Sequence, residues 1–149
     1  MKIFKFVQLS TGEWAQAFAV VDEDGNQVLG RYIIGVALSD LTSDLEVATA
    51  AILFAQTDFT IKNIFAGAGV VPTDAAIEID TEKNGTTIFS TRLTIDATES
   101  TSLTAATPFV LATGQDVFTK GDKIEIKITQ IGSTIAGAAC TIYFEISAS

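Results

Sequence analysis

The chemistry open to this sequence is limited first by its side-chain inventory. It contains no histidine, which is the usual general base near neutral pH and the commonest neutral metal ligand. Ser-His-Asp and Cys-His catalysis are therefore impossible within one chain. A carboxylate pair of the aspartic-protease or glycosidase type is formally possible. However, Glu78, Asp80 and Glu82 alternate along one strand-like run, which predicts a solvated face. We therefore expect no catalytic residues.

One acidic run has the residue types of a metal site. Residues 22–26 are Asp-Glu-Asp-Gly-Asn, and spaced carboxylates with a glycine resemble the start of a calcium loop. The bidentate Glu that such a loop needs at position twelve is missing, because Ile33 stands there. The run therefore favours a hairpin turn, with a weak calcium site shared with a neighbouring subunit as the alternative. We expect no resident metal and no cofactor.

The glycine-rich run at 67–69 is not a phosphate-binding loop, since neither Gly-Lys-Ser/Thr nor a helix start follows it. It predicts a bulge or a tight crossing that loosens the chain. Cys140 is the only cysteine, so no disulfide can form within the chain, and its apolar surroundings predict a small buried hydrophobe. Trp14, Tyr32 and Tyr143 could form a sugar platform, but their scatter over different strands favours core or interface positions.

Composition excludes several classes of partner. The chain has 149 residues, of which 48% are hydrophobic and 18% charged, against roughly 25% charged in typical soluble domains. Some of the surface must therefore be apolar, which often indicates burial against partners. The formal charge of −9 argues against a nucleic-acid or anionic-membrane partner, because both need clustered Lys and Arg. No apolar stretch is long enough for a secretory signal or a membrane span, so we expect a soluble protein.

Alternation of apolar and polar residues dominates the chain and predicts strands. The clearest strand covers residues 123–131, where Ile124, Ile126 and Ile128 share one face. The alternating run 76–82 is followed by an Asn84-Gly85 pair, which favours a type I′ turn because both residues tolerate positive φ. Further strands are expected at residues 2–9, 14–21, 27–36, 58–65, 87–91, 93–95, 109–111 and 140–146, with a loop over 96–107.

Two segments between residues 39 and 56 are less regular. Residues 39–46 are the best candidate for a helix start, because Ser43 and Glu46 have the spacing of a capping box. Residues 47–56 fit a short helix or a strand, and the Ile52-Leu53-Phe54 cluster favours a strand.

About ten short strands spaced by 8–12 residues predict a sandwich or barrel. The fold class that we predict is all-β, a jelly-roll-like antiparallel β-sandwich with an N-terminal β-hairpin module. We divide the chain into an N-terminal β module at residues 1–45 and a β-sandwich domain at residues 46–149. The Asp24-Gly25 pair would form the turn of the N-terminal hairpin.

The order of landmarks in the second part of the chain resembles a known group of domains. The alternating strand 76–82 leads into Lys-Asn-Gly-Thr-Thr-Ile-Phe at 83–89, then Thr-Ile-Asp-Ala at 94–97 and a Thr/Ser-rich loop. Lys-Gly-Asp at 120–122 then precedes an alternating strand that ends in Gln-Ile-Gly-Ser-Thr at 130–134. Over residues 58–146 this pattern resembles the β-sandwich domains of tailed-phage virion accessory proteins, which occur in head-decoration, head-fibre and tail-fibre proteins.

The resemblance implies a non-enzymatic structural protein of the virion. We expect it to be made in the host cytoplasm and to bind the outer capsid surface as a decoration or head-fibre protein. Its expected partners are the major capsid protein and its own copies, with which it would form a homotrimer. Residues 1–45 would form the docking or oligomerisation segment, with a possible docking surface at Ile3, Phe4, Phe6, Trp14 and Phe18.

Two alternatives stay open. One is a tail-fibre or baseplate receptor-binding module that recognises cell-surface glycan, and the other is a bacterial or host-side binding domain unrelated to virions.

Overall fold

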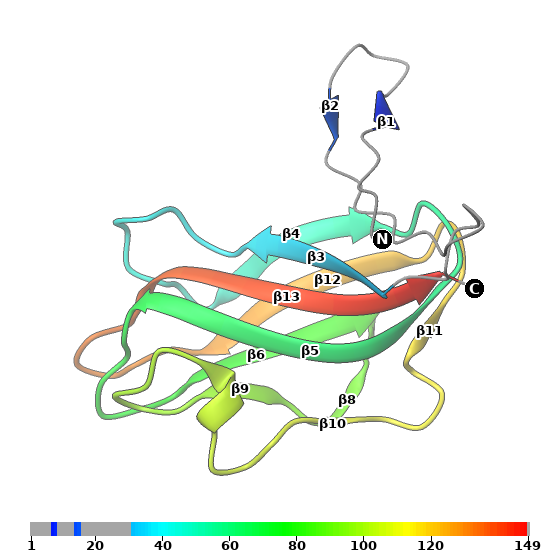
Figure 1. Cartoon of the computed structure of the whole chain (residues 1–149). Coiled ribbons are helices and arrows are strands. Elements are labelled where there is room, and N and C mark those ends of the chain that lie inside the picture. The colour runs from blue at the N-terminus through cyan, green and yellow to red at the C-terminus, as the bar shows by residue number, and fades with distance from the viewer. Residues whose placement is uncertain (1–6, 9–13, 16–30, 149) are drawn as a thin grey trace, which may run out of the picture.

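The computed structural model describes residues 7–8, 14–15 and 31–148, and two antiparallel sheets stack face to face in this part of the chain (Figure 1). The predicted all-β, sandwich-like fold is confirmed. Among the described residues the one helical element is the short 3-10 helix η1, Ser102–Thr104. Thr101 caps it by accepting a hydrogen bond from the Leu103 N–H.

The sheet nearer the viewer in Figure 1, called the front sheet here, has four strands. Their order is β11 (Val117–Phe118), β5 (Phe59–Val70), β13 (Ala138–Ala148) and β3 (Arg31–Ala37). The long pairing of β13 with β5 runs from Ala138↔Val70 to Ala148↔Phe59. Since β3 flanks the other side of β13, the middle of the front sheet is built from segments far apart in sequence.

The second sheet, called the back sheet, has five strands. Their order is β4 (Ala48–Phe54), β12 (Lys123–Gln130), β6 (Ile77–Lys83) and β7 (Thr86–Thr87), and β9 (Leu93–Ile95) also pairs with β6. Two small pairs complete the described elements, namely β8 (Phe89–Thr91) with β10 (Val110–Leu111) and β1 (Val7–Gln8) with β2 (Trp14–Ala15).

The core lies between the two sheets and follows the predicted alternation. On β12 the side chains of Ile124, Ile126 and Ile128 are buried, while the residues between them are partly exposed. On β13 the buried positions are Cys140, Ile142, Phe144 and Ile146. Because successive side chains of a strand point to opposite faces, this pattern places the apolar face of each sheet against the other.

The predicted boundary at residue 45 needs correction, because residues 31–45 are part of the sandwich. Strand β3 pairs with β13 from Thr141↔Ala37 to Ser147↔Arg31. Leu38 and Leu45, which follow β3, are buried in the same core as the later strands. The pairing partner of β3 lies more than 100 residues away, so no local pattern indicated it.

The helix start expected at residues 39–46 is absent. Asp40 instead holds a local turn, since its carboxylate accepts hydrogen bonds from the N–H groups of Thr42 and Ser43 at 2.9 and 2.6 Å. A short polar side chain that bonds to nearby backbone in this way favours a turn over a helix. The strand favoured for residues 47–56 is confirmed as β4.

The glycine-rich run does not interrupt its strand, because β5 continues through it to Val70. A Cβ atom on Gly69 would lie 2.9 Å from the Cβ of Ala139 on the paired strand β13, so the glycine allows a close approach of two neighbouring strands. The expected bulge or tight crossing and the loosening of the chain are not found there, because the register shift of this pair lies at Glu145 and Ile146. The predicted turn is confirmed at Asn84 and Gly85, whose φ angles are 51° and 84°. Strand β11 was not predicted.

Candidate docking surfaces

The predicted docking residues fall largely outside the described part of the chain. Ile3, Phe4, Phe6 and Phe18 lie outside the described residues, as do the Asp22–Asn26 run and its calcium alternative. The backbone of Trp14 pairs with Gln8 between β2 and β1, and its side chain is not described. The docking hypothesis for these residues therefore stays a prediction.

The nucleophilic and metal-binding groups of the described ranges do not gather into a reactive or metal-binding cluster. Within them, no group of three or more Asp, Glu, His or Cys side chains is arranged to hold a metal ion. The Cys140 thiol is fully buried as predicted, and this burial raises its pKa to about 11. Since the thiolate is the reactive form, Cys140 acts as a core residue in this fold.

Asp80 differs from its prediction, because it is buried and not part of a solvated face. Two segments that follow β6 cover its outward side. The Thr87 hydroxyl donates a hydrogen bond of 2.5 Å to Asp80 Oδ1, and the Arg92 Nε lies 3.2 Å from Oδ2. A buried carboxylate needs such partners, so this arrangement is structural and leaves no free acid–base pair.

Glu78 shares the same arginine. Its carboxylate accepts hydrogen bonds from the Thr129 hydroxyl at 2.6 Å and from Arg92 Nη1 at 2.8 Å. The Thr129 hydrogen bond is the largest cause that lowers the pKa of Glu78, followed by Arg92. Arg92 therefore links two carboxylates of β6 into one network on the outward face of the back sheet.

Ion pairs continue along β12 and β6 on that outward face, whereas the exposed Ile52 and Phe54 make its β4 edge apolar. Lys127 Nζ lies 2.7 Å from Glu82 Oε2 on the neighbouring strand, and Lys123 Nζ lies 3.0 Å from Glu125 Oε1. Water and salt screen such pairs, so this part of the face is better understood as a hydrated charged surface than as a source of stability.

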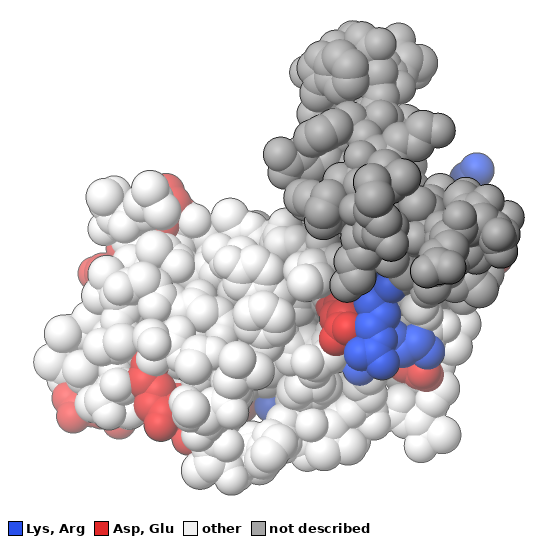
Figure 2. All heavy atoms as spheres, in the orientation of Figure 1, with Lys and Arg blue, Asp and Glu red and all other residues white. Residues whose placement is uncertain are grey.

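The outward face of the front sheet has a different character. At its centre the rings of Phe65 and Tyr143 stack at 4.7 Å with an angle of 14° between their planes. The residues that alternate with buried positions around this stack are small or uncharged, namely Gly35, Ala37, Gly67, Gly69, Ala139 and Thr141. Figure 2 shows this face white over its middle, with red and blue atoms toward its margins.

Charges on this face gather where β3 begins. Arg31 Nη1 lies 2.9 Å from Glu145 Oε1, which places an ion pair across β3 and β13, and the exposed Lys62 lies on β5 near the same end. The sandwich therefore has a charged back face and a front face whose centre is aromatic and neutral. This contrast could not be predicted from the sequence, because it depends on which strands are neighbours.

The two tyrosines do not form a common platform, as their positions on different strands indicated. Tyr32 packs against the buried core on the inner side of β3, whereas Tyr143 lies on the outward side of β13. The Tyr143 ring stacks on Phe65 and also packs over Gly35, where a Cβ would lie 3.2 Å from its Cε1 atom.

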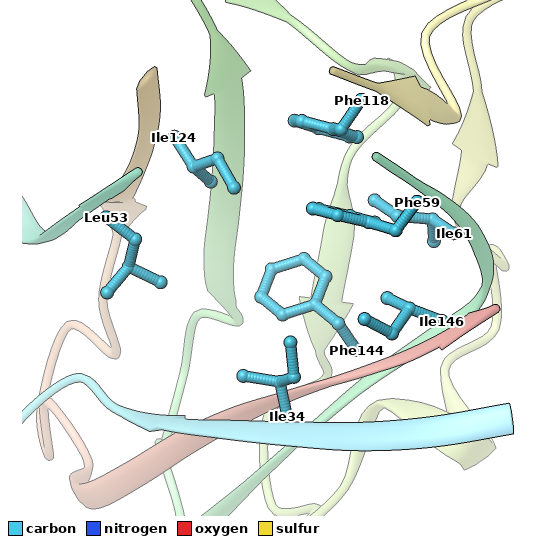
Figure 3. Close-up of a pocket in the computed structure, with 8 residues that line it drawn as sticks. All are labelled: Ile34, Leu53, Phe59, Ile61, Phe118, Ile124, Phe144 and Ile146. Carbon is cyan, nitrogen blue, oxygen red and sulfur yellow. The ribbon is translucent and has the colours of Figure 1, made fainter. Parts of the chain in front are cut away.

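A small apolar cavity lies between the sheets, close to the edge strands β3 and β4 (Figure 3). Its volume is about 30 Å³, and its lining includes Ile34 of β3, Leu53 of β4 and the stacked rings of Phe59 and Phe118. Ligand pockets usually have roughly ten times this volume or more, so we interpret the cavity as a packing gap.

A larger hollow of about 270 Å³ lies beside the turn at residues 38–46. Its lining contains Asp40, Asp44 and Glu46 together with the side chains of Leu38 and Leu45. Asp40 is occupied by its hydrogen bonds to Ser43 and Thr42, which lower its pKa to about 2. The carboxylate of Asp40 in this hollow is therefore ionised and already bound to the backbone and side chains of the turn.

No helix among the described residues has the length and apolar character needed to cross a membrane. The fold and surfaces together define a class, that of all-β sandwich proteins with one charged and one neutral face. No protein-family model, curated protein or solved structure matches the chain.

Proposed function

We propose that this chain is a structural protein of a tailed-phage particle, a decoration or head-fibre protein that binds the outer capsid surface. Its partners are the major capsid protein and other copies of the chain, and its action is passive docking without chemistry. The resemblance of residues 58–146 to virion accessory domains supports the phage setting.

The neutral centre of the front sheet is the observation that carries the docking role. Burying a surface against a protein partner costs little where the surface holds no unpaired charge, and aromatic residues are enriched at such interfaces. The Phe65–Tyr143 stack, with small residues around it, offers this kind of surface. The back sheet suits exposure to water, because charged pairs lie along the outward side of β6 and β12.

The test combines particle composition with a matched pair of variants. Purified phage should contain the protein in many copies, and cryo-electron microscopy should show its density on the outer capsid. Thr141→Glu places a charge in the centre of the front face, next to Gly35, and should reduce the binding of the full chain to particles that lack it. Ile52→Glu adds the same charge at an exposed position of the back sheet and should leave binding intact.

These outcomes separate the proposal from its rivals. Absence of the protein from purified particles would overturn the phage assignment. Equal binding by both folded variants would overturn the role of the front face, whatever the particle composition.

The Phe65–Tyr143 stack on the outward face favours one alternative, a receptor-binding module of a tail fibre or baseplate that recognises glycan. Aromatic rings stack on sugars, and the Arg31–Glu145 ion pair lies two residues further along β13 as a source of hydrogen bonds. Saturable binding on a glycan array that is lost in Tyr143→Ala would support this function. An array without binding would reject it.

A further inference from the structure

The edges of the two sheets differ in how well they are protected against pairing with another chain. An edge strand presents unpaired N–H and C=O groups, and proteins usually protect it by shortness, bulges, charges or proline. In the described part of the chain the front sheet ends at β11 and β3, and the back sheet ends at β4 and at the short strands β7 and β9 beside β6.

The two sheets have four edges, and three of them, at β11, at β7 with β9, and at β4, carry a recognised protection. Strands β11 and β7 have two residues each and β9 has three, so they offer few groups for pairing. Strand β4 is longer, but its register against β12 shifts between Ile126↔Ala51 and Lys127↔Thr49. A bulge of this kind bends and twists an edge, and thereby opposes further pairing.

Strand β3 has none of these protections. It is seven residues long and pairs with β13 without any register shift. Its sequence, Arg-Tyr-Ile-Ile-Gly-Val-Ala, has no proline and a single charge at its first residue. Ile33 and Ile34 are large apolar residues that are 67% and 40% exposed, which is unusual for a strand whose other neighbour is a buried central strand.

We propose that β3 pairs antiparallel with β3 of a second copy across a two-fold axis, so that two front sheets join into one and the chain forms a dimer in place of the homotrimer that the resemblance implies. This inference stands on the edge geometry and does not depend on the phage assignment. Pairing by strand addition uses backbone hydrogen bonds for affinity and alternate side chains for register. A two-fold interface is self-complementary, since each copy presents the same strand.

The sequence of β3 fits one register of this pairing. When all seven residues of β3, Arg31–Ala37, pair with the same seven residues of the second copy, the two-fold axis passes at Ile34. This register places Ile33 opposite the partner's Gly35. Ile33 can then pack against the Tyr143 ring that lies over the partner's Gly35, where a Cβ would come within 3.2 Å of Cε1. The same register places Ile34 opposite the partner's Ile34 and covers the open side of the apolar cavity that it lines.

The charges of β3 also favour the antiparallel arrangement. Arg31 is its only charged residue, and it forms an ion pair with Glu145 of its own chain. In the register centred on Ile34 the two Arg31 residues lie six residues apart along the joined edge, or about 20 Å. This separation exceeds the Debye length of about 8 Å at physiological ionic strength, so their repulsion is screened. Parallel pairing would bring them side by side.

The experiment is sedimentation velocity on the full chain over a range of concentrations, with two charge variants. The wild-type chain should form a dimer. Ile33→Lys, at an exposed outward position of β3, should shift it to monomer by at least tenfold in dissociation constant. Ile52→Lys, at a 52% exposed outward position of the other long edge strand, should leave the dimer intact. Circular dichroism confirms that each variant is folded.

A cysteine scan tests the register independently. Ile34→Cys should form a disulfide between copies on mild oxidation, because only residue 34 faces itself across the axis and paired strands place opposite Cα atoms within disulfide range. Ile33→Cys should not form one, and the native Cys140 is fully buried. A monomeric wild type, a trimer, or a dimer lost in Ile52→Lys but kept in Ile33→Lys would overturn the proposal. If the protein forms the dimer and the predicted crosslink but never binds phage particles, the dimer proposal is supported and the proposed phage function is rejected.

Discussion

Thr81, in the middle of β6, is a polar residue at a position where the core should be apolar. Its side chain is fully buried on the inner face of the back sheet, opposite Ile126 of β12. Within the described structure its Oγ1 atom has no hydrogen-bond partner. Replacing Thr81 with Val keeps the shape of the side chain and removes the unpaired hydroxyl. We therefore predict that Thr81→Val stabilises the protein.

The expected gain follows from the cost of an unpaired buried polar group. Leaving such a group without a partner costs about 1–3 kcal/mol, and we expect about 1 kcal/mol here, because a single hydroxyl is removed and one methyl is added. For a domain of this size, 1 kcal/mol corresponds to a rise of roughly 2–4 °C in Tm.

Thr87→Val is the matched control, since it makes the same chemical change six residues away, at a position where the hydroxyl donates a hydrogen bond. The Thr87 hydroxyl donates to the buried Asp80, so its loss leaves a carboxylate with one partner fewer. Hydrogen bonds to charged groups contribute roughly 1.5–3 kcal/mol, and we expect a destabilisation of about 2 kcal/mol. The two Thr→Val substitutions should therefore change the free energy of unfolding in opposite directions.

Urea unfolding monitored by circular dichroism, together with thermal melts, measures both variants against the wild type. Refutation would come from a Thr81→Val variant that is less stable than the wild type, or from a Thr87→Val variant that is equally stable. The first result would mean that the Thr81 hydroxyl is satisfied, and the second that Asp80 does not need Thr87.

Three further predictions concern other parts of the sandwich. The hydrogen bond from Thr129, and then Arg92, keeps the pKa of Glu78 below its usual 4.5 in the folded state. This stabilisation is present above the unfolded pKa and is lost as the pH falls through the folded value. In thermal melts below about pH 4.5, the Tm of Thr129→Val should therefore fall less with pH than the Tm of the wild type. The Cys140 thiol, with its pKa raised to about 11 by burial, should resist a thiol reagent at pH 8 until urea unfolds the chain, and rapid labelling of native protein would contradict its burial. Gly85→Ala should cost about 1 kcal/mol by urea unfolding because Gly85 has a φ of 84°, and an unchanged midpoint would show that the turn relaxes.

Local patterning predicted the strands whose two faces differ in polarity. The Ile124-Ile126-Ile128 alternation marks both the strand and its buried side, and Asn84-Gly85 marks a turn whose geometry few other residues adopt. These features depend on residues close together in sequence, so they can be inferred without the fold.

Features that depend on distant neighbours could not be predicted in this way. The alternation of β6 places Asp80 on the outward side, but only the fold brings Thr87 and Arg92 over it and buries it. The assignment of β3 to an N-terminal module was wrong for the same reason, since β3 depends on β13 for its place. The neutral front face likewise arises from β3, β5 and β13 lying side by side.

The position of β13 has a consequence for how the chain matures. It follows every other described strand along the sequence, yet it lies between β5 and β3. During synthesis the front sheet cannot close until this strand has left the ribosome, and both of its neighbours wait with unpaired edges until then. Pairing over such long sequence separations is slow, so folding should be limited by the arrival of β13, and nascent chains cut short before residue 138 should aggregate.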